Sequence, residues 1–414
     1  MEGRATQRGR GLGKVAVVAG LVAGLTYACV GASISETSPG TTSGGVPEMA
    51  ARDVLVSLTD GVIVPTYRDF VAASVALEEA TAAHRAAPDE ETLAAAQAAF
   101  RDAMAVWQRA ELMQVGPAGS MMAPGGQGLR ALIYSWPLVN PCRIDQKLVD
   151  ESYGDVDALT AELVNAQGLD ALEYLLFHTG DDNACSAPNS INTQGTWAAI
   201  VGELTERRAA YAHNAAVVLR GHATALRDAW EDSGGDFASE VKEAGAGSAI
   251  FATTQTALNA ISDGMFYLDG ETKDMKLAVP AGLMDCLEET CPGAIELPHS
   301  RTSLAAVREN LVAARLIFTG GPPDAVDAPG FDDLLAQVGD PSLSTEIVEA
   351  LDAAFAALDA IEHENLAQAL ADPVDLERVR ALYQAVKKVS DLLKADFVTV
   401  LNLELPRAVE GDND

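Results

Sequence analysis

Two acidic residues, Asp170 and Glu173, lie three positions apart in an otherwise apolar run, "QGLDALEYLLF". In a helix, residues at i and i+3 share one face, so both carboxylates could reach a single metal ion or proton-transfer site. Carboxylate oxygens suit hard cations such as Ca²⁺, Mg²⁺, Mn²⁺ or iron better than metals that prefer thiolates. Acids at this spacing are also common on the solvent-facing stripe of an amphipathic helix. From the spacing alone, both interpretations stay open.

A third acid, Glu111, could complete such a site, with Asp145 and Glu296 as weaker additions. Carboxylates collected in one place would bind a divalent or ferric metal ion through oxygen ligands alone. The sequence therefore predicts a metal pocket formed by Glu111, Asp170 and Glu173.

Glu111 also has a structural interpretation. A carboxylate at this position could cap a helix or pair with a nearby basic side chain. Three arginines could be its partner: Arg130, Arg207 and Arg208.

The six histidines give no zinc signature. A zinc peptidase helix offers His-Glu-x-x-His, with two imidazoles one turn apart, and this segment is missing. His178 follows Glu173 by five residues, which would turn it away from the acidic face, and we expect every histidine to be a surface residue. The chain also has no phosphate-binding loop, no Gly-x-Gly-x-x-Gly after a strand and no Gly-x-Ser-x-Gly.

The elements that must position these acids are predicted to be helices. Hydrophobic residues make up 48% of the chain and aromatic residues only 5%, which favours an aliphatic, helix-forming composition. Glycines and prolines in residues 116–157 predict loops, which often line sites. Apolar spacing predicts helices over residues 47–85 with a kink at Pro65, 88–115, 129–135, 156–177, 193–230, 237–267, 302–318, 344–370 and 373–403.

The length of 414 residues predicts two domains, because single cores stop growing at roughly 250 to 300 residues. Each half offers about four substantial helices, and the Gly pair in residues 232–235 marks a boundary between them. We therefore expect an all-α fold of two four-helix-bundle-like domains side by side. Residues 47–233 would form the N-terminal bundle, which carries Asp170 and Glu173, and residues 234–414 the C-terminal bundle.

The N-terminus is typical of an exported protein. Residues 1–28 combine a basic start with a short apolar segment, as in a signal peptide. The sequence "LTYAC" resembles a bacterial lipobox, so Cys29 would become a lipidated N-terminus and the membrane would be reached only through that anchor. An ordinary cleaved signal or an uncleaved anchor are the alternatives. Residues 29–46 are rich in Ser, Thr, Gly and Pro, as in a flexible tether.

Four other cysteines remain, and export predicts that they form disulfides. Of the three possible connectivities, the most economical joins Cys142 to Cys185 and Cys286 to Cys291. Zinc ligation is the rival, but the spacing, with no nearby His, does not match a zinc site.

The formal net charge of −32 excludes nucleic acid as a partner, since nucleic-acid binding needs a basic face. Cations are the more natural partners. Surface solubility alone is the alternative explanation of this charge.

The run "GLDALEYLLF" is similar to the signature of the imelysin family, Gly-x-His-x-x-Glu followed by an aromatic residue and Leu-Leu. Gly168, Glu173 and Tyr174 match, as do the two leucines that follow, while Asp170 stands where the family's His is usual. Other segments resemble family landmarks in order and spacing across residues 50–405: "IVPTYRDF", "ELMQVGP", "SWPLVNPCRID", "RRAAYAHNAAVVLRGHATALRDAW", "KLAVPAG" and "ELPHSRTSL".

The resemblance implies an all-α protein of the bacterial cell envelope. The family is named for a proposed metallopeptidase activity, and relatives are associated with periplasmic iron uptake. It implies binding of a hard cation such as iron in metal uptake or handling, with an envelope transporter or iron-uptake components as partners. The alternatives are a metallopeptidase, in which Glu173 would be catalytic, and a metal-free module that binds a protein or another ligand. Because Asp170 replaces the imidazole, it favours oxygen ligation over zinc proteolysis.

Overall fold

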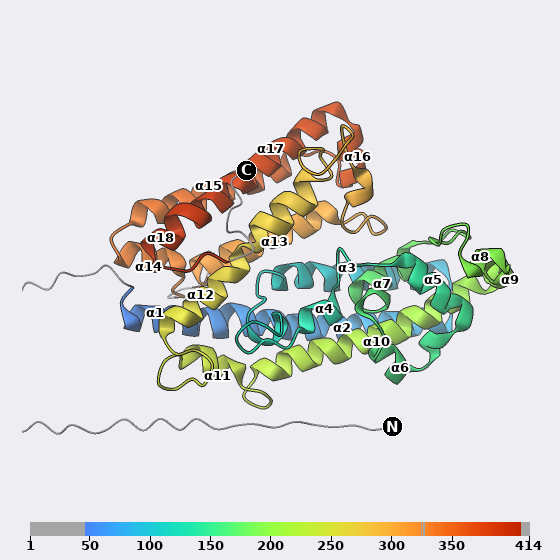
Figure 1. Ribbon diagram of the computed structural model, residues 1–414, viewed down its shortest axis with the longest axis horizontal. Coiled ribbons are helices and arrows are strands. Elements are labelled where there is room, and N and C mark those ends of the chain that lie inside the picture. Colours follow the sequence, from blue (N-terminus) through green and yellow to red (C-terminus); the bar gives the residue numbers. More distant parts are fainter. Residues whose placement is uncertain (1–45, 324, 326–327, 407–414) are drawn as a thin grey trace, which may run out of the picture. The chain divides into compact units, whose positions relative to one another are not determined.

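The computed structural model describes residues 46–323, 325 and 328–406, and in these ranges the chain is helical without any strand (Figure 1). The all-α prediction is confirmed. The predicted signal peptide, Cys29 and the tether up to residue 45 lie outside the described residues. No helix of the described ranges is long and apolar enough to cross a membrane.

One group of helices carries the signature run. Its long members are α2 (Val64–Ala86), α3 (Glu90–Ala110) and α10 (Leu204–Trp230). Helix α2 packs on both α3 and α10, and these two pack on the short helix α7 (Gly168–Phe177). A capping box starts α3, because the Asp89 side chain accepts a hydrogen bond from the Thr92 N–H at 2.8 Å. Helix α1 (Glu48–Leu58) leads into α2 through a π-helical turn, η1 (Thr59–Ile63).

The predicted kink at Pro65 corresponds to this π-helical turn. Pro65 lies in the first turn of α2, where a missing N–H costs little. The helix therefore changes its winding just before the proline and continues after it.

A second group contains α13 (Ser303–Thr319), α15 (Pro341–Asp359) and α17 (Pro373–Leu392), together with the π-helix η6 (Leu268–Ala278). The two groups meet where α3 packs on α13, and there the Asn310 side-chain N–H donates to the Gln108 carbonyl at 2.7 Å. The proposed domain boundary near residue 233 stays a prediction.

Shorter elements complete the described chain. The α-helices are α4 (Leu129–Ile133), α5 (Pro141–Asp150), α6 (Val156–Thr160), α8 (Ser190–Thr193), α9 (Thr196–Ile200), α11 (Phe237–Lys242), α12 (Thr254–Met265), α14 (Phe331–Gln337), α16 (Leu366–Ala371) and α18 (Val398–Val400). The remaining helical turns are η2 (Gly116–Ala118), η3 (Ser152–Gly154), η4 (Val164–Ala166), η5 (Val201–Glu203), η7 (Pro292–Ala294) and η8 (Leu393–Phe397).

Some predicted helices were too long. The pattern over 237–267 is two helices, α11 and α12, because Gly245 adopts φ +106°, a left-handed conformation that ends a helix. The pattern over 156–177 is likewise interrupted before Gly168. The predicted helix over 344–370 is divided into α15 and α16, and the one over 373–403 into α17, η8 and α18.

Two disulfides join Cys142 to Cys185 and Cys286 to Cys291. The predicted connectivity is therefore confirmed, and zinc ligation by these four cysteines is wrong.

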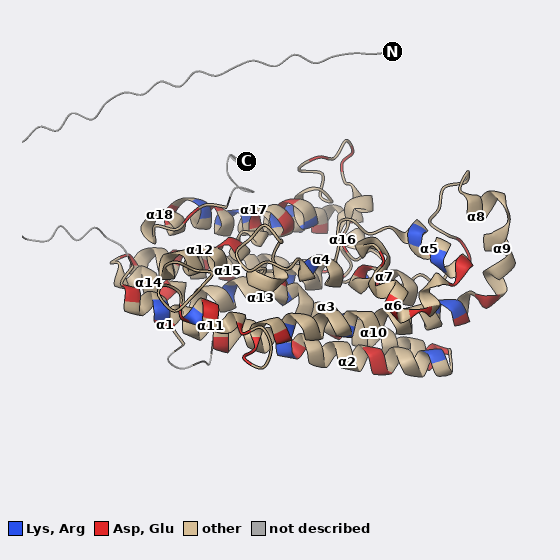
Figure 2. Cartoon of the chain, turned by 60° about the horizontal axis from the view of Figure 1, so that its bottom comes forward, with Lys and Arg blue, Asp and Glu red and all other residues tan. Residues whose placement is uncertain are grey.

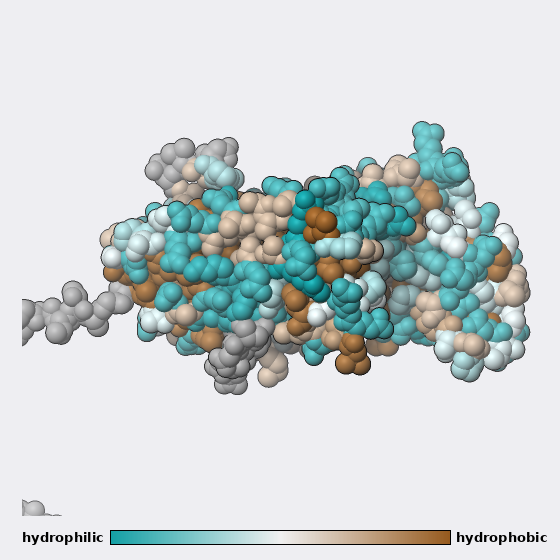
Figure 3. Space-filling view, turned by 90° about the horizontal axis from the view of Figure 1, so that it is seen from above, coloured by the Kyte–Doolittle hydropathy of each residue, from teal (hydrophilic) through white to brown (hydrophobic). Residues whose placement is uncertain are grey.

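Acidic and basic residues are interspersed along the helices in Figure 2. Hydrophilic residues cover most of the face seen in Figure 3, with hydrophobic residues in small groups between them. Apolar side chains fill the interior of both helix groups.

Candidate functional site

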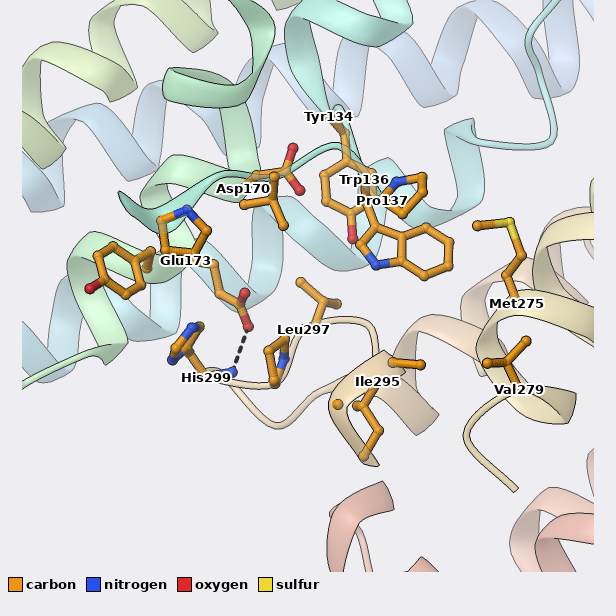
Figure 4. A pocket seen from close by; sticks show the side chains of 16 residues that line it. Tyr134, Trp136, Pro137, Asp170, Glu173, Met275, Val279, Ile295, Leu297 and His299 are labelled. Atoms are coloured by element: carbon orange, nitrogen blue, oxygen red, sulfur yellow. Dashed lines mark hydrogen bonds between the residues drawn. The ribbon is translucent and has the colours of Figure 1, made fainter. Parts of the chain in front are cut away.

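Helix α7 forms one wall of a pocket of about 290 Å³ (Figure 4). The other walls come from residues 134–141, from the end of η6 and from residues 293–299. The lining residues are Tyr134, Trp136, Pro137, Val139, Pro141, Asp170, Glu173, Tyr174, Met275, Val279, Gly293, Ala294, Ile295, Leu297, Pro298 and His299.

The start of α7 is fixed by a glycine that no other residue could replace without strain. Gly168 has φ +73°, and a Cβ atom there would lie 2.6 Å from the carbonyl oxygen of Ile133. This close approach brings the first turn of α7 against the end of α4. Asp170 and Glu173 then lie on one face and both line the pocket, as their spacing predicts.

Asp170 is held by a single serine. Its Oδ2 atom accepts hydrogen bonds from the Ser135 backbone N–H at 2.6 Å and from the Ser135 hydroxyl at 2.8 Å. Only 4% of Asp170 is exposed. Burial raises the pKa of Asp170 to about 6, although the bonds from Ser135 oppose this shift.

Glu173 has a similar environment, built from the loop that follows η7. Its Oε1 atom accepts hydrogen bonds from the His299 N–H at 3.1 Å, the Ser300 N–H at 2.8 Å and the Ser300 hydroxyl at 2.8 Å. Burial raises the pKa of Glu173 to about 7, and the negative charge of Asp170 adds to the shift.

Neither carboxylate has a positively charged partner among the described residues. Four other buried acids have an ion pair within 4 Å: Glu111, Asp269, Glu296 and Asp375. Asp170 and Glu173 have none, and in each the second carboxylate oxygen accepts no hydrogen bond from a described residue. Each of these carboxylates therefore has one oxygen with no hydrogen bond and no ion pair within 4 Å to a described residue, and Arg130 acts on Asp170 only from a greater distance.

Glu111 lies outside this pocket. It is fully buried and pairs with Arg130, whose Nη2 atom is 2.9 Å from Oε2. Glu111 instead lines a second cavity together with Glu271 and Tyr267. The structural interpretation of Glu111, with Arg130 as its partner, matches this geometry.

The weaker additions, Glu296 and Asp145, are also buried outside the pocket lining. Glu296 pairs with Lys276 at 3.1 Å and accepts a hydrogen bond from the Tyr134 hydroxyl at 2.7 Å. Asp145 accepts hydrogen bonds from the Tyr174 hydroxyl at 3.1 Å and from the Ala184 N–H at 2.7 Å. Both acids support residues that line the pocket.

Within the described ranges, no group of three or more His, Cys, Asp or Glu side chains is placed to hold a metal ion. Of the three predicted ligands, the structure brings Asp170 and Glu173 together and leaves Glu111 with Arg130. A metal ion in the pocket would therefore take two protein carboxylates and complete its coordination with water or with backbone oxygens.

Sequence reasoning missed the residues that hold and flank the acids: Ser135, Trp136, His299 and Ser300. All four belong to "SWPLVNPCRID" and "ELPHSRTSL", which were noted as landmarks but given no role. The expectation that every histidine is a surface residue is wrong, since His84 and His222 are buried. His299 is half-buried beside the pocket, with its ring centroid 5.2 Å from that of Tyr174.

A family model described as imelysin matches residues 63–393 of the chain. The chain belongs to the imelysin family. Its signature run is helix α7, and the position where the family's His is usual is Asp170, one of the two uncompensated carboxylates of the pocket. No curated protein matches the chain.

Solved structures similar to this imelysin chain share its fold. One is a protein described as a candidate iron-regulated protein A precursor from Parabacteroides distasonis ATCC 8503, with a TM-score of 0.67 and 17% identity over 88% of this chain and 97% of that one. Another is an imelysin-like protein from Psychrobacter arcticum 273-4, with a TM-score of 0.65 and 17% identity over 87% of this chain and 99% of that one.

Proposed function

We propose that this imelysin-family protein captures a cation in the pocket formed around Asp170 and Glu173. The two carboxylates are 4% and 6% exposed and lack an ion pair with any described residue. An uncompensated buried charge is costly, so a ligand that brings a positive charge gains more here than it would at the surface. This missing compensation is the observation that carries the proposal.

We further propose that the capture takes place at the cell envelope, as one step of uptake or handling. The two disulfides support an oxidising compartment. Lipidation of Cys29 and delivery to an envelope transporter are parts of the same proposal. Iron is the metal suggested by the description of the Parabacteroides distasonis protein as iron-regulated.

The test is isothermal titration of the purified protein at pH 8 with a panel of cations: Fe²⁺, Mn²⁺, Ca²⁺, Zn²⁺ and an organic ammonium ion. We expect at least one of these to bind, with affinity reduced tenfold or more by Asp170→Asn and by Glu173→Gln. Glu48→Gln is the matched control, since this acid lies on α1 with 80% of its side chain exposed. If no cation binds, or if Glu48→Gln weakens binding as much as the pocket variants do, the proposal fails.

A further inference from the structure

Apart from the two carboxylates, the side chains that line the pocket are mostly apolar or aromatic. Met275, Val279, Ile295 and Leu297 contribute hydrocarbon surface. In Figure 4 the Asp170 and Glu173 side chains lie at one side of the pocket, and those of Met275 and Val279 lie at the other. The pocket therefore has a charged end and an apolar end.

This lining suits a bare metal ion poorly. Hard cations take about six oxygen ligands or more, and among the described residues that line the pocket Asp170 and Glu173 are the only acids. The rest of a metal's coordination shell would have to come from water or backbone oxygens, and most side chains around that shell are apolar and offer bound water no hydrogen bonds. A cation with an apolar substituent would pair with the charged end of the pocket and pack against the apolar end.

The volume of the pocket also favours a small molecule over a single metal ion. About 290 Å³ is far more than a single ion fills and lies near the lower limit of about 300 Å³ for small-molecule sites. Trp136 and Tyr174 add aromatic surface close to the acids, and aromatic faces attract organic cations.

We infer that the cation captured by this pocket is an organic ammonium ion, a primary amine with a compact apolar substituent; this inference rests on the proposed function. The ammonium group donates hydrogen bonds to the free oxygens of Asp170 and Glu173. Its substituent packs against Met275, Val279 and Ile295. Ser135 and Ser300 keep the acceptors in place by occupying the other oxygen of each carboxylate.

The experiment compares phenethylamine with its neutral isostere, 2-phenylethanol, by isothermal titration of the full mature chain at pH 8. We expect the amine to bind at least tenfold more tightly than the alcohol. Glu173→Gln and Asp170→Asn should each reduce amine affinity tenfold or more, whereas Glu48→Gln should leave it unchanged. Circular dichroism of each variant checks that it is folded.

Val279→Ser tests the apolar end separately. This side chain is only half-buried, so its truncation should be tolerated. It should weaken phenethylamine binding severalfold while leaving the binding of any metal ion unchanged.

The outcomes separate this inference from the proposed function. If metal ions bind in a manner sensitive to Glu173→Gln and the amine does not bind, the inference is overturned and cation capture stands. If the alcohol binds as well as the amine, charge is not what the pocket recognises, and the inference is overturned as well. If neither the amine nor any metal ion binds, both proposals fail.

Discussion

Buried carboxylates occur in two different settings in this molecule. Glu111 and Glu296 are each compensated by a cation of the same chain, Arg130 and Lys276. Asp170 and Glu173 are buried almost as deeply, yet the hydrogen bonds that they accept from described residues all come from neutral donors. Burial alone therefore does not separate the two sets. The acids that we propose to bind a cation are those that line an open cavity and have no ion pair with a described residue.

The ion pair between Glu296 and Lys276 holds helices together. Lys276 contacts Glu296 at 3.1 Å, Gln108 at 2.6 Å and Asn310 at 2.9 Å, and so joins η6, α3 and α13. This network lies where the two helix groups meet. Its charges are satisfied by each other and leave nothing for a ligand.

The largest effect should come from removing a cation of the compensated set. Lys276→Met leaves Glu296 as an unpaired charge with 0% exposure, and breaking a buried pair from one side costs about 3 to 5 kcal/mol. Urea unfolding at pH 8 measures this loss. The double variant Lys276→Met/Glu296→Gln should recover much of the lost stability. If Lys276→Met alone is as stable as the wild type, the compensated acids do not differ from the uncompensated ones.

Replacing Asp170 or Glu173 with its amide should raise the free energy of unfolding, whereas Lys276→Met should lower it. The folded-state pKa values of about 6 for Asp170 and about 7 for Glu173 lie above the ordinary values of 3.8 and 4.5. Their stabilising protonation is complete below pH 4 and is lost as the pH rises through 7. Glu173→Gln should therefore stabilise the ligand-free protein by about 2 to 3 kcal/mol at pH 8.

Thermal unfolding at pH 4 and pH 8 tests this sign, with Glu48→Gln as the control. The advantage of Glu173→Gln should nearly vanish at pH 4, where the wild-type acid is protonated in both states. If Glu173→Gln is less stable than the wild type at pH 8, Glu173 stabilises the fold as the compensated acids Glu111 and Glu296 do.

Cation binding should depend on pH in the same window. A bound cation favours the ionised carboxylates, so lowering the pH from 8 to 5 makes the ligand compete with protons at Asp170 and Glu173. We expect affinity to fall tenfold or more over this range. A pH-independent affinity, measured by titration in matched buffers, would show that these two groups do not bind the cation.

The smallest effect should come from a serine that holds an acid. Ser300→Ala removes one of three hydrogen bonds to Glu173 Oε1 and should cost about 1 to 2 kcal/mol at pH 8. Because the bond favours the ionised form, the variant should also raise the pKa of Glu173 further. Ser135→Ala is the matched change at Asp170, and an equal loss at pH 4 and pH 8 would mean that neither hydroxyl acts on a charge.

The sequence was sufficient for most of the fold because periodic apolar residues report helix faces directly. The sequence pattern did not predict the helix ends that a single residue determines. Gly245 and Gly168 interrupt patterns that otherwise continue, since their left-handed backbone ends or starts a helix. The winding of η6 is also invisible to periodicity, because a π-helical register follows from tertiary packing.

The site was predictable only in part. Asp170 and Glu173 share a helix, so their spacing alone places them on one face. The partners of the acids come from elsewhere in the chain: Ser300 is 127 positions from Glu173 and Lys276 is 20 positions from Glu296. No local pattern distinguishes Glu111, which pairs with Arg130, from Glu173, which has no ion pair with a described residue.

Both disulfides lie beside the pocket walls. Cys142 directly follows the lining residue Pro141, and Cys291 precedes the lining residues Gly293 and Ala294 by two and three positions. Two covalent cross-links thus flank the segments that form the pocket walls. Under the proposal that the protein is exported and captures a cation, a chain still in a reducing cytosol would lack both cross-links. We then expect cation affinity to appear only after export, so that the newly made protein does not withdraw the cation from the cell interior.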